Sequence, residues 1–249
     1  MLNARAAMTT ASIKTGNHGQ QVKTERRFLI LLGVLAGLAP SAWCRSDFQV
    51  RCENTLPKTV SVLSARQNGY SIDTHVSYRM LTRMGAPGSG DVVLGLTRMN
   101  SRVEMGLAGQ ILQDPSSGYE CIAPQIKVAL IYSPMKVYVG KEFPVDSCAY
   151  QEILKHELRH VQVYQEHLPK VEAIVRAALS KAFQAEPLYA PSGQAQMLLQ
   201  QKINDGWIAY IQAEMHKVEA LQALIDTPQE YARLGKACNG EVQKMLRGN

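Results

Sequence analysis

The sequence lacks any apolar run long enough to cross a bilayer, which takes about 20 consecutive residues. The longest such run, Phe28 to Leu38, has eleven residues. The chain also has no internal repeat and no low-complexity tract, and aromatic residues make up only 6 % of it. These features exclude a disordered or collagenous chain and predict no transmembrane span. With 249 residues, 46 % of them apolar, the chain is long enough to bury a hydrophobic core.

Excess charge of one sign is also scarce outside the first 44 residues. The formal net charge is +6, but the first 44 residues hold five basic residues and one acid. The remaining residues therefore carry a net charge of only +2. This charge is too small to indicate a nucleic-acid groove or a polybasic membrane patch, and we exclude both classes of partner.

The first 44 residues have the pattern of a secretory signal. Lys23, Arg26 and Arg27 precede the apolar run, and small residues follow it. We therefore expect an exported protein, periplasmic or secreted, that is cleaved behind Cys44. The first 22 residues are either a long basic region or the product of a start codon placed too early. Acylation of Cys44 would instead make a lipoprotein, although Trp43 is larger than the residue that this processing prefers.

Cysteine is scarce, and the number of cysteines agrees with export. Removal of Cys44 with the signal leaves Cys52, Cys121, Cys148 and Cys238. Four cysteines in an oxidising compartment predict two disulfides. Three pairings are possible, and the sequence does not choose among them.

The residues after the leader are expected to form a single α+β domain, 45–249, with a β-rich part at 45–146 and a helical part at 147–249. Asn68-Gly69 stands between apolar segments and predicts a β-hairpin of residues 60–63 with 70–78. Further strands are predicted at 92–99, 103–107, 126–132 and 137–139. Helices are predicted at 147–168, where Pro169 ends the first, at 170–183, from about 194 to 225, and from Pro228, behind a capping box at 227–230.

The sequence His156-Glu157-Leu158-Arg159-His160, within the first predicted helix, is the HExxH pattern of zinc sites. Histidines four residues apart project from the same helical face, so both imidazoles reach one Zn²⁺ ion. Glu157, beside the first histidine, is placed to take a proton from a water molecule at the metal. From the His and Glu content, a chance match has a frequency on the order of one per cent. We therefore predict Zn²⁺ as the cofactor.

This motif on a helix resembles that of the zincin metallopeptidases. The order of signal, β-rich part, HExxH helix and helical tail is also similar to that of small secreted bacterial zinc proteases of unknown substrate. The firm part of the resemblance covers Ser147 to Tyr164. It implies a zincin-like fold, zinc bound by His156 and His160, Glu157 as the general base, and a peptide or protein substrate. The alternative is a non-catalytic periplasmic binding or assembly protein on a zincin-like scaffold.

The third zinc ligand does not follow the spacing of the metzincins. In that group a third histidine comes six residues after the second, behind a glycine that breaks the helix. Here Val163 stands in the place of the glycine, and His167 comes seven residues after His160. On an unbroken helix His167 would lie roughly 10 Å along the axis from His160, which is too far to share a metal.

A carboxylate from a later helix is the expected third ligand. Glu214 is preferred slightly because it flanks an apolar stripe, where an unpaired carboxylate is unfavourable. Glu230 is nearly equal to it, in a polar cluster with Asp226 and Tyr231, although the capping box already explains a Glu there. Glu172 is the third choice.

Two further roles are predicted near the motif. Tyr164, one turn after His160, is a candidate to orient a ligand or to polarise a carbonyl group, with core packing as the alternative. Val137 to Val139 is expected to be an edge strand that holds an extended peptide.

Overall fold

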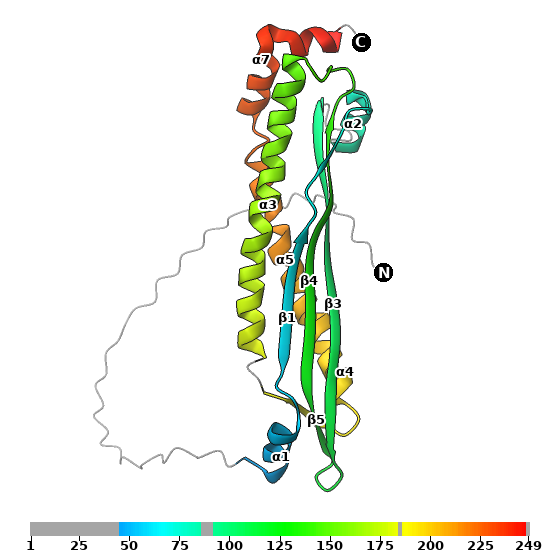
Figure 1. Cartoon of the computed structure of the whole chain (residues 1–249), viewed down its shortest axis with the longest axis vertical. Helices are drawn as coiled ribbons and strands as arrows, with labels where there is room; N and C mark the ends of the chain where they lie inside the picture. Colours follow the sequence, from blue (N-terminus) through cyan, green and yellow to red (C-terminus); the bar gives the residue numbers. More distant parts are fainter. Residues whose placement is uncertain (1–44, 86–91, 184–185, 248–249) are drawn as a thin grey trace, which may run out of the picture. The chain divides into compact units, whose positions relative to one another are not determined.

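The computed structural model describes residues 45–85, 92–183 and 186–247 (Figure 1). The leader 1–44, with the predicted cleavage site and the alternative lipid site at Cys44, lies outside the described residues. Within the described ranges no helix combines the length and the apolar character that a membrane span requires.

A five-stranded mixed sheet organises this α/β fold. Its centre is a long hairpin of β3 (Gly95–Asp114) and β4 (Tyr119–Val139). β1 (Val60–Gln67) and β2 (Ser71–Asp73) pair in parallel with two successive stretches of β4. β5 (Leu188–Pro191) pairs antiparallel with the beginning of β4. β4 is therefore the strand to which all the others bind.

The hairpin predicted around Asn68-Gly69 is wrong. β1 and β2 do not pair with each other, because both pair with β4. Gly69 does adopt a positive φ of 68°, as a turn residue should. The strand predicted to continue to Tyr78 ends at Asp73, and Tyr78 begins helix α2 (Tyr78–Gly85). Pairing with a long buried strand outweighed the local turn signal.

Residues 137–139 do not form an edge strand, contrary to the prediction. Val137 pairs with Ile72 of β2 and also with Thr97 of β3, so this stretch is hydrogen-bonded on both sides. β3, by contrast, pairs only with β4 among the strands of the described part of the chain. β3 is therefore one edge of the sheet, and β1, β2 and β5 form the other.

The HExxH motif lies in α3 (Cys148–Ala182), a helix of 35 residues that runs along one face of the sheet (Figure 1). The predicted stop at Pro169 is wrong, because the helix continues through it. Proline removes one helical hydrogen bond. Leu168 and Val171, on either side of it, are buried in the core under the sheet, and this packing keeps the helix continuous.

The long helix predicted from 194 to 225 is interrupted. A π-helical turn separates its first two segments, and α7, which follows, is bent at 237–240 by three consecutive residues with positive φ. Half of the predicted capping box of α7 is confirmed, since Thr227 Oγ1 accepts from the backbone N–H of Glu230 at 3.2 Å. The carboxylate of Glu230 contacts His156 and two arginines instead. The elements are α4 (Ala195–Lys202), η1 (Ile203–Trp207), α5 (Ile208–His216), α6 (Val218–Ala223) and α7 (Pro228–Arg247).

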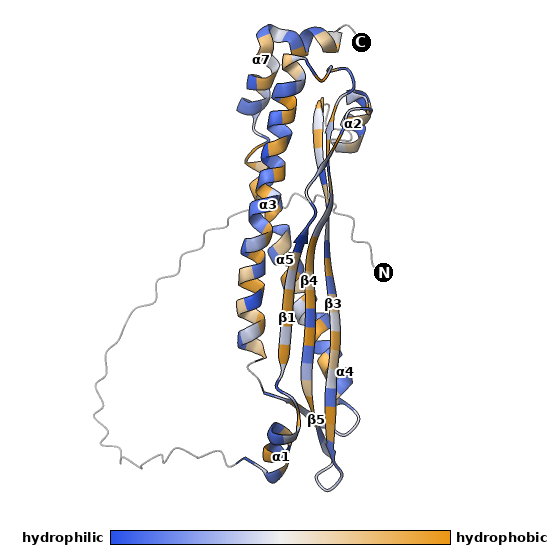
Figure 2. Ribbon diagram, viewed as in Figure 1, coloured by the Kyte–Doolittle hydropathy of each residue, from blue (hydrophilic) through white to orange (hydrophobic). Residues whose placement is uncertain are grey.

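The main core lies between the sheet and helices α3 to α5. Alternate residues of β4, from Ile126 to Tyr132, are buried against α3, and Ile211 and Met215 of α5 complete this cluster. Figure 2 shows the matching alternation of hydrophobic and hydrophilic residues along β4. The sheet thus carries helices mainly on one face, and α1 (Asp47–Thr55) packs near the hairpin tip through Phe48.

Two disulfides are present, which confirms the number predicted. Cys52 in α1 pairs with Cys121 in β4, and Cys148 at the start of α3 pairs with Cys238 at the bend of α7. These bonds are compatible with an exported protein. The second bond fixes the C-terminal segment to the helix that carries the HExxH motif.

Loss of the second disulfide is expected to destabilise the protein strongly. Cys148 and Cys238 are 90 residues apart, so replacing both with Ala frees a long loop in the unfolded chain. The free energy of unfolding should fall by about 2–5 kcal/mol, measured by urea denaturation of the oxidised protein. Unfolding midpoints that are equal in the variant and the oxidised parent would contradict this expectation.

Candidate metal centre

The HExxH segment is buried between the start of β3 and the start of α7. The N-cap Ser147 begins α3 by accepting from the backbone N–H of Tyr150, and the motif follows two turns later. His156, Glu157 and His160 are 4 %, 4 % and 8 % exposed. Three buried polar side chains on one helix require polar partners from other elements.

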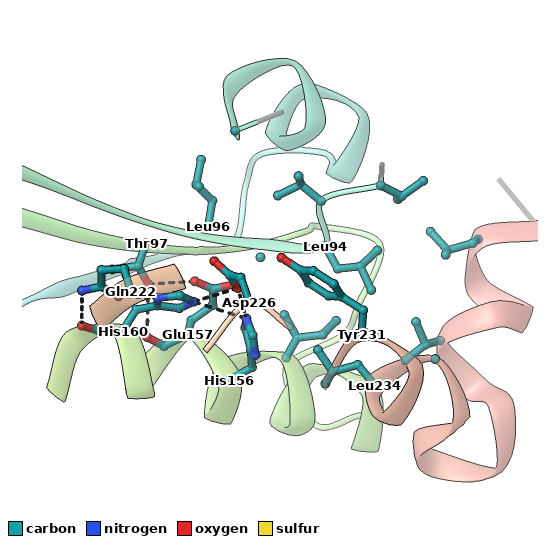
Figure 3. A pocket seen from close by; sticks show the side chains of 18 of the residues that line it. Leu94, Leu96, Thr97, His156, Glu157, His160, Gln222, Asp226, Tyr231 and Leu234 are labelled. Atoms are coloured by element: carbon teal, nitrogen blue, oxygen red, sulfur yellow. Dashed lines mark hydrogen bonds and ion pairs between the residues drawn. The ribbon is translucent and has the colours of Figure 1, made fainter. Parts of the chain in front are cut away.

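Asp226, in the loop between α6 and α7, joins the two histidines (Figure 3). The Nε2 atoms of His156 and His160 are 3.3 Å apart, and Oδ1 of Asp226 lies 3.2 Å from each of them. Ligand atoms at about 2.0–2.1 Å from a tetrahedral Zn²⁺ are separated by roughly 3.3–3.4 Å. The spacing of these three atoms therefore fits zinc, and three protein ligands are the number found in catalytic sites.

The other ring nitrogen of each histidine also has an oxygen partner. Nδ1 of His160 contacts Oε1 of Gln222, whose Nε2 donates to the carbonyl oxygen of His160 at 3.1 Å. Nδ1 of His156 lies 2.9 Å from Nη2 of Arg159, which can only donate, and 3.2 Å from Oε1 of Glu230. In His160, donation from Nδ1 to the Gln222 oxygen selects the tautomer whose Nε2 is free to bind a metal. Gln222 therefore orients the imidazole of His160, and Glu230 and Arg159 both contact the imidazole of His156.

Glu230 is held behind His156 by two arginines. It forms ion pairs with Arg159 and with Arg233, and Arg233 also pairs with Glu152. The hydrogen bond from Arg233 is the main reason that the pKa of Glu230 is lowered to about 2, against the opposing effect of burial. Glu230 is thus an ionised carboxylate that supports a histidine and lies outside the group of three donor atoms.

Glu157 faces the beginning of β3 (Figure 3). Oγ1 of Thr97 donates to Oε2 of Glu157 at 2.8 Å, and a Cβ added at Gly95 would come within 2.7 Å of Oε1. Burial raises the pKa of Glu157, although the neighbouring His160, the Thr97 hydrogen bond and His156 act in the opposite direction. The carboxyl group of Glu157 therefore lines the same cavity as the two histidines, with a pKa above its usual value.

The charges at the centre also favour a cation. Burial opposes ionisation of Asp226, but hydrogen bonds from His156 and His160 outweigh it and lower the pKa of Asp226 below its usual range. Burial likewise opposes protonation of His160, while hydrogen bonds to Asp226 and Gln222 raise its pKa overall. One ionised carboxylate and two imidazoles on a single point are a suitable donor set for a divalent metal ion.

The structure does not bring the carboxylates favoured by sequence into this group. Glu214 lies in α5, and its Oε2 pairs with Nζ of Lys217 at 2.6 Å, which supplies the cation that its apolar flanks require. Glu172 pairs with Arg176 one turn later on α3. The donor atom beside the histidines comes instead from Asp226. The loop between α6 and α7, rather than α5, therefore supplies the carboxylate at the motif.

Tyr164 lines the same cavity as the histidines. Its ring packs edge-to-face on Tyr132, with centroids 5.7 Å apart, so it has a packing role while its catalytic role stays a prediction. His167, excluded as a ligand, contacts the hydroxyl of Tyr132 through Nδ1 at 2.9 Å.

Sequence reasoning missed Thr97 and Gln222, which no local pattern marks. Asp226 had a signal in its position just before the cap of α7.

A cavity of about 450 Å³ opens beside the donor atoms, which is within the usual size of a ligand site. Thr97 at the edge of β3, the histidines of α3, Asp226 and Tyr231 all line it. No family model, no curated protein and no solved structure matches this chain. Function is therefore inferred from the residues of the site.

Proposed function

We propose that this chain is an exported zinc-dependent peptidase with a zincin-like site. His156, His160 and Asp226 bind the metal, and Glu157 is the general base. The observation that carries the proposal is the triangle of two Nε2 atoms and one carboxylate oxygen, 3.2–3.3 Å on each side, next to the Glu of an HExxH motif. The two disulfides support export.

The chemistry follows from the positions of these groups. Zinc supplies Lewis acidity, which polarises a carbonyl group and lowers the pKa of water. Glu157 takes a proton from the water that attacks the scissile carbonyl carbon and gives it to the leaving nitrogen as the C–N bond breaks. Tyr164 lines the same cavity, and its hydroxyl is the candidate donor to the oxyanion that develops.

The substrate is proposed to lie along the start of β3. Gly95, Leu96 and Thr97 line the cavity, and β3 has no second strand partner in the described ranges. An extended peptide adds to such an edge through main-chain hydrogen bonds. This places the scissile bond near Glu157, which contacts both Gly95 and Thr97.

One observation favours the non-catalytic alternative. The carboxylate of Glu157 is buried and Oε2 accepts a hydrogen bond from Thr97, a contact that also suits a purely structural side chain. A binding protein on the same scaffold would keep Glu157 in this position. The activity of a Glu157 variant separates the two functions.

Zinc affinity of carboxylate variants tests the ligand set. Asp226→Ala should weaken zinc binding by at least about 10- to 100-fold, because it removes one of three donor atoms. The measurement is competition with a chelator. Glu214→Ala is the matched control, because it removes a carboxylate that pairs with Lys217, and it should leave zinc affinity unchanged. Equal affinities in the two variants, or a loss confined to Glu214→Ala, would contradict the ligand assignment.

A further inference from the structure

The sheet has a second face, opposite to the one that packs on the core helices. Leu63, Val128 and Met105 are register partners that point into the main core, so the residues between them along each strand point to the other side. On this other side α1 packs against Cys121, and Gly85 of α2 lies next to Leu96. Figure 1 shows β1, β4 and β3 side by side between α1 and α2. We call this stretch the open face, formed by alternate residues of 60–66, 71–73, 98–110 and 123–136.

The charged residues of the open face are mainly basic. The register places five cations in three rows across the strands: Lys127; Arg66 with Arg102; and Lys136 with Arg98. Two carboxylates, Glu104 and Asp73, lie on the same face, so five positive and two negative charges leave a net formal charge of +3. The whole chain after the leader carries +2, so the rest of it carries −1. The small net charge of the protein therefore conceals a basic face.

Two of these cations have no carboxylate partner in the described part of the chain. Arg98 and Lys127 are exposed, and neither forms an ion pair there. Arg66 and Arg102 share one carboxylate, since Nη2 of Arg66 is 3.3 Å and Nε of Arg102 is 3.8 Å from the oxygens of Glu104. Exposed pairs of this kind contribute little to stability. The cations can therefore accept an anion from outside the chain at little cost to the fold.

The middle row is held in place by packing. Ile131 points to the open face, yet it is only 3 % exposed. Its register partners on the two sides are Arg66 and Arg102. The aliphatic stems of these arginines shield Ile131, while their charged ends stay at the surface. The two guanidinium groups are thus positioned side by side before any ligand binds.

The residues between the rows are small or carry uncharged hydrogen-bonding groups. Amide and hydroxyl side chains donate and accept hydrogen bonds as sugar hydroxyls do. Aromatic side chains, which are enriched at protein interfaces, are absent from the described strands of the open face between Lys127 and Lys136. The exposed side chains of Val60 and Val62 are the apolar part of this surface. The residues in question are Ser64, Gly106, Ala108, Gln110, Gln125 and Ala129.

We propose that the open face binds a linear polysaccharide that carries carboxylate groups. The arginine forks match carboxylates, and the serine and glutamine side chains match the hydroxyls between them. The rows run from Lys127 to Lys136, nine residues further along β4, which is roughly 30 Å at about 3.3 Å per residue. The ligand is therefore a polymer and not a single sugar.

This site is separate from the metal centre. Thr97, whose side chain contacts Glu157, points to the helical side of the sheet, and its neighbour Arg98 points to the open face. The proposal goes beyond the peptidase function and does not depend on it. Binding of this kind would retain an exported protein on a surface that carries the polymer.

Calorimetric titration of the oxidised protein with polygalacturonate tests the proposal. The polymer should bind, and raising the ionic strength should weaken binding because exposed charges are screened. Fully methyl-esterified polygalacturonate, which keeps the chain but has no charge, should not bind. Digalacturonate, which is too short to join two rows, should bind at least about tenfold more weakly than the polymer.

Charge variants locate the binding to the open face. The double variant Arg98→Gln, Lys127→Gln should bind polygalacturonate at least about tenfold more weakly, because it removes a charged hydrogen-bond donor from each end of the face. The matched control is Lys170→Gln, Lys181→Gln, which removes two exposed cations from α3, and it should bind as the parent does. Glu104→Gln should tighten binding by about threefold, because Arg66 and Arg102 lose their shared carboxylate.

Four results would each overturn the proposal. The first is no binding of polygalacturonate by the parent, and the second is equal binding of the polymer and its methyl ester. The third is an equal loss of affinity in the two double variants, which would indicate attraction to overall charge. The fourth is tighter binding of polyglutamate, duplex DNA or phosphatidylglycerol vesicles than of polygalacturonate, which would assign the open face to another class of partner.

Discussion

Glu157→Gln is expected to lower kcat/KM for peptide hydrolysis by about 10²- to 10⁴-fold while zinc stays near one ion per chain. The glutamine side chain has nearly the same shape and can still accept the hydrogen bond from Thr97, but it cannot take up a proton. Glu157 is not among the three donor atoms, so the metal site is unaffected. Steady-state kinetics and metal analysis of the same preparations give both quantities.

Glu166→Gln is the control for this substitution. Glu166 lies in the same helix, is exposed, and accepts a hydrogen bond from Nε2 of Gln162 at 2.8 Å, so its replacement should change neither activity nor zinc content. An active parent together with an equally active Glu157→Gln variant would refute the role of Glu157 as a base. Absence of hydrolysis in both proteins, on a broad peptide library, would favour the non-catalytic binding protein.

Replacing both His156 and His160 with Ala should abolish zinc binding altogether. The double variant retains a single donor atom, on Asp226, and one carboxylate does not hold Zn²⁺ against water. Equilibrium dialysis followed by metal analysis measures the loss, and hydrolysis should disappear with the metal. If the double variant bound zinc as tightly as the parent, the metal site would lie elsewhere.

His75 and His216 supply the control for the histidine pair. Both side chains are largely exposed, at 93 % and 57 %, and within the described part of the chain neither belongs to a group of residues that could hold a metal. Their double replacement with Ala should leave one zinc per chain. Loss of zinc in this control would show that exposed histidines contribute to binding.

The parts of the fold that were predicted correctly depend on short-range patterns. The start of α3 behind Ser147, the cap of α7 at Thr227 and the number of disulfides follow from neighbouring residues or from composition. The errors at Asn68-Gly69 and at Pro169 have one cause. In each case a local signal was outweighed by burial against β4 and the core beneath it, which the sequence does not display.

In the candidate site, too, the residues that a short-range sequence pattern marks were predicted, and those that depend on the fold were not. His156, Glu157 and His160 could be identified from sequence because residues four apart share a helical face at any position in the fold. Asp226 is 66 residues from His160, and its selection over Glu214 depends on where the breaks in the C-terminal helices place the loop before α7. Glu230 was predicted as a metal ligand. In the structure its carboxylate instead contacts Nδ1 of His156, the ring nitrogen on the side away from the three donor atoms.

Anomalous diffraction at the zinc edge, from crystals grown with one equivalent of zinc, tests the central claim most directly. The proposed site predicts one strong peak at about 2.0–2.2 Å from Nε2 of His156, Nε2 of His160 and a carboxylate oxygen of Asp226. It also predicts that the remaining coordination position holds water or another exchangeable ligand. A peak at Glu214 or Glu172, a site closed by a fourth protein ligand, or no peak at the two histidines would contradict it.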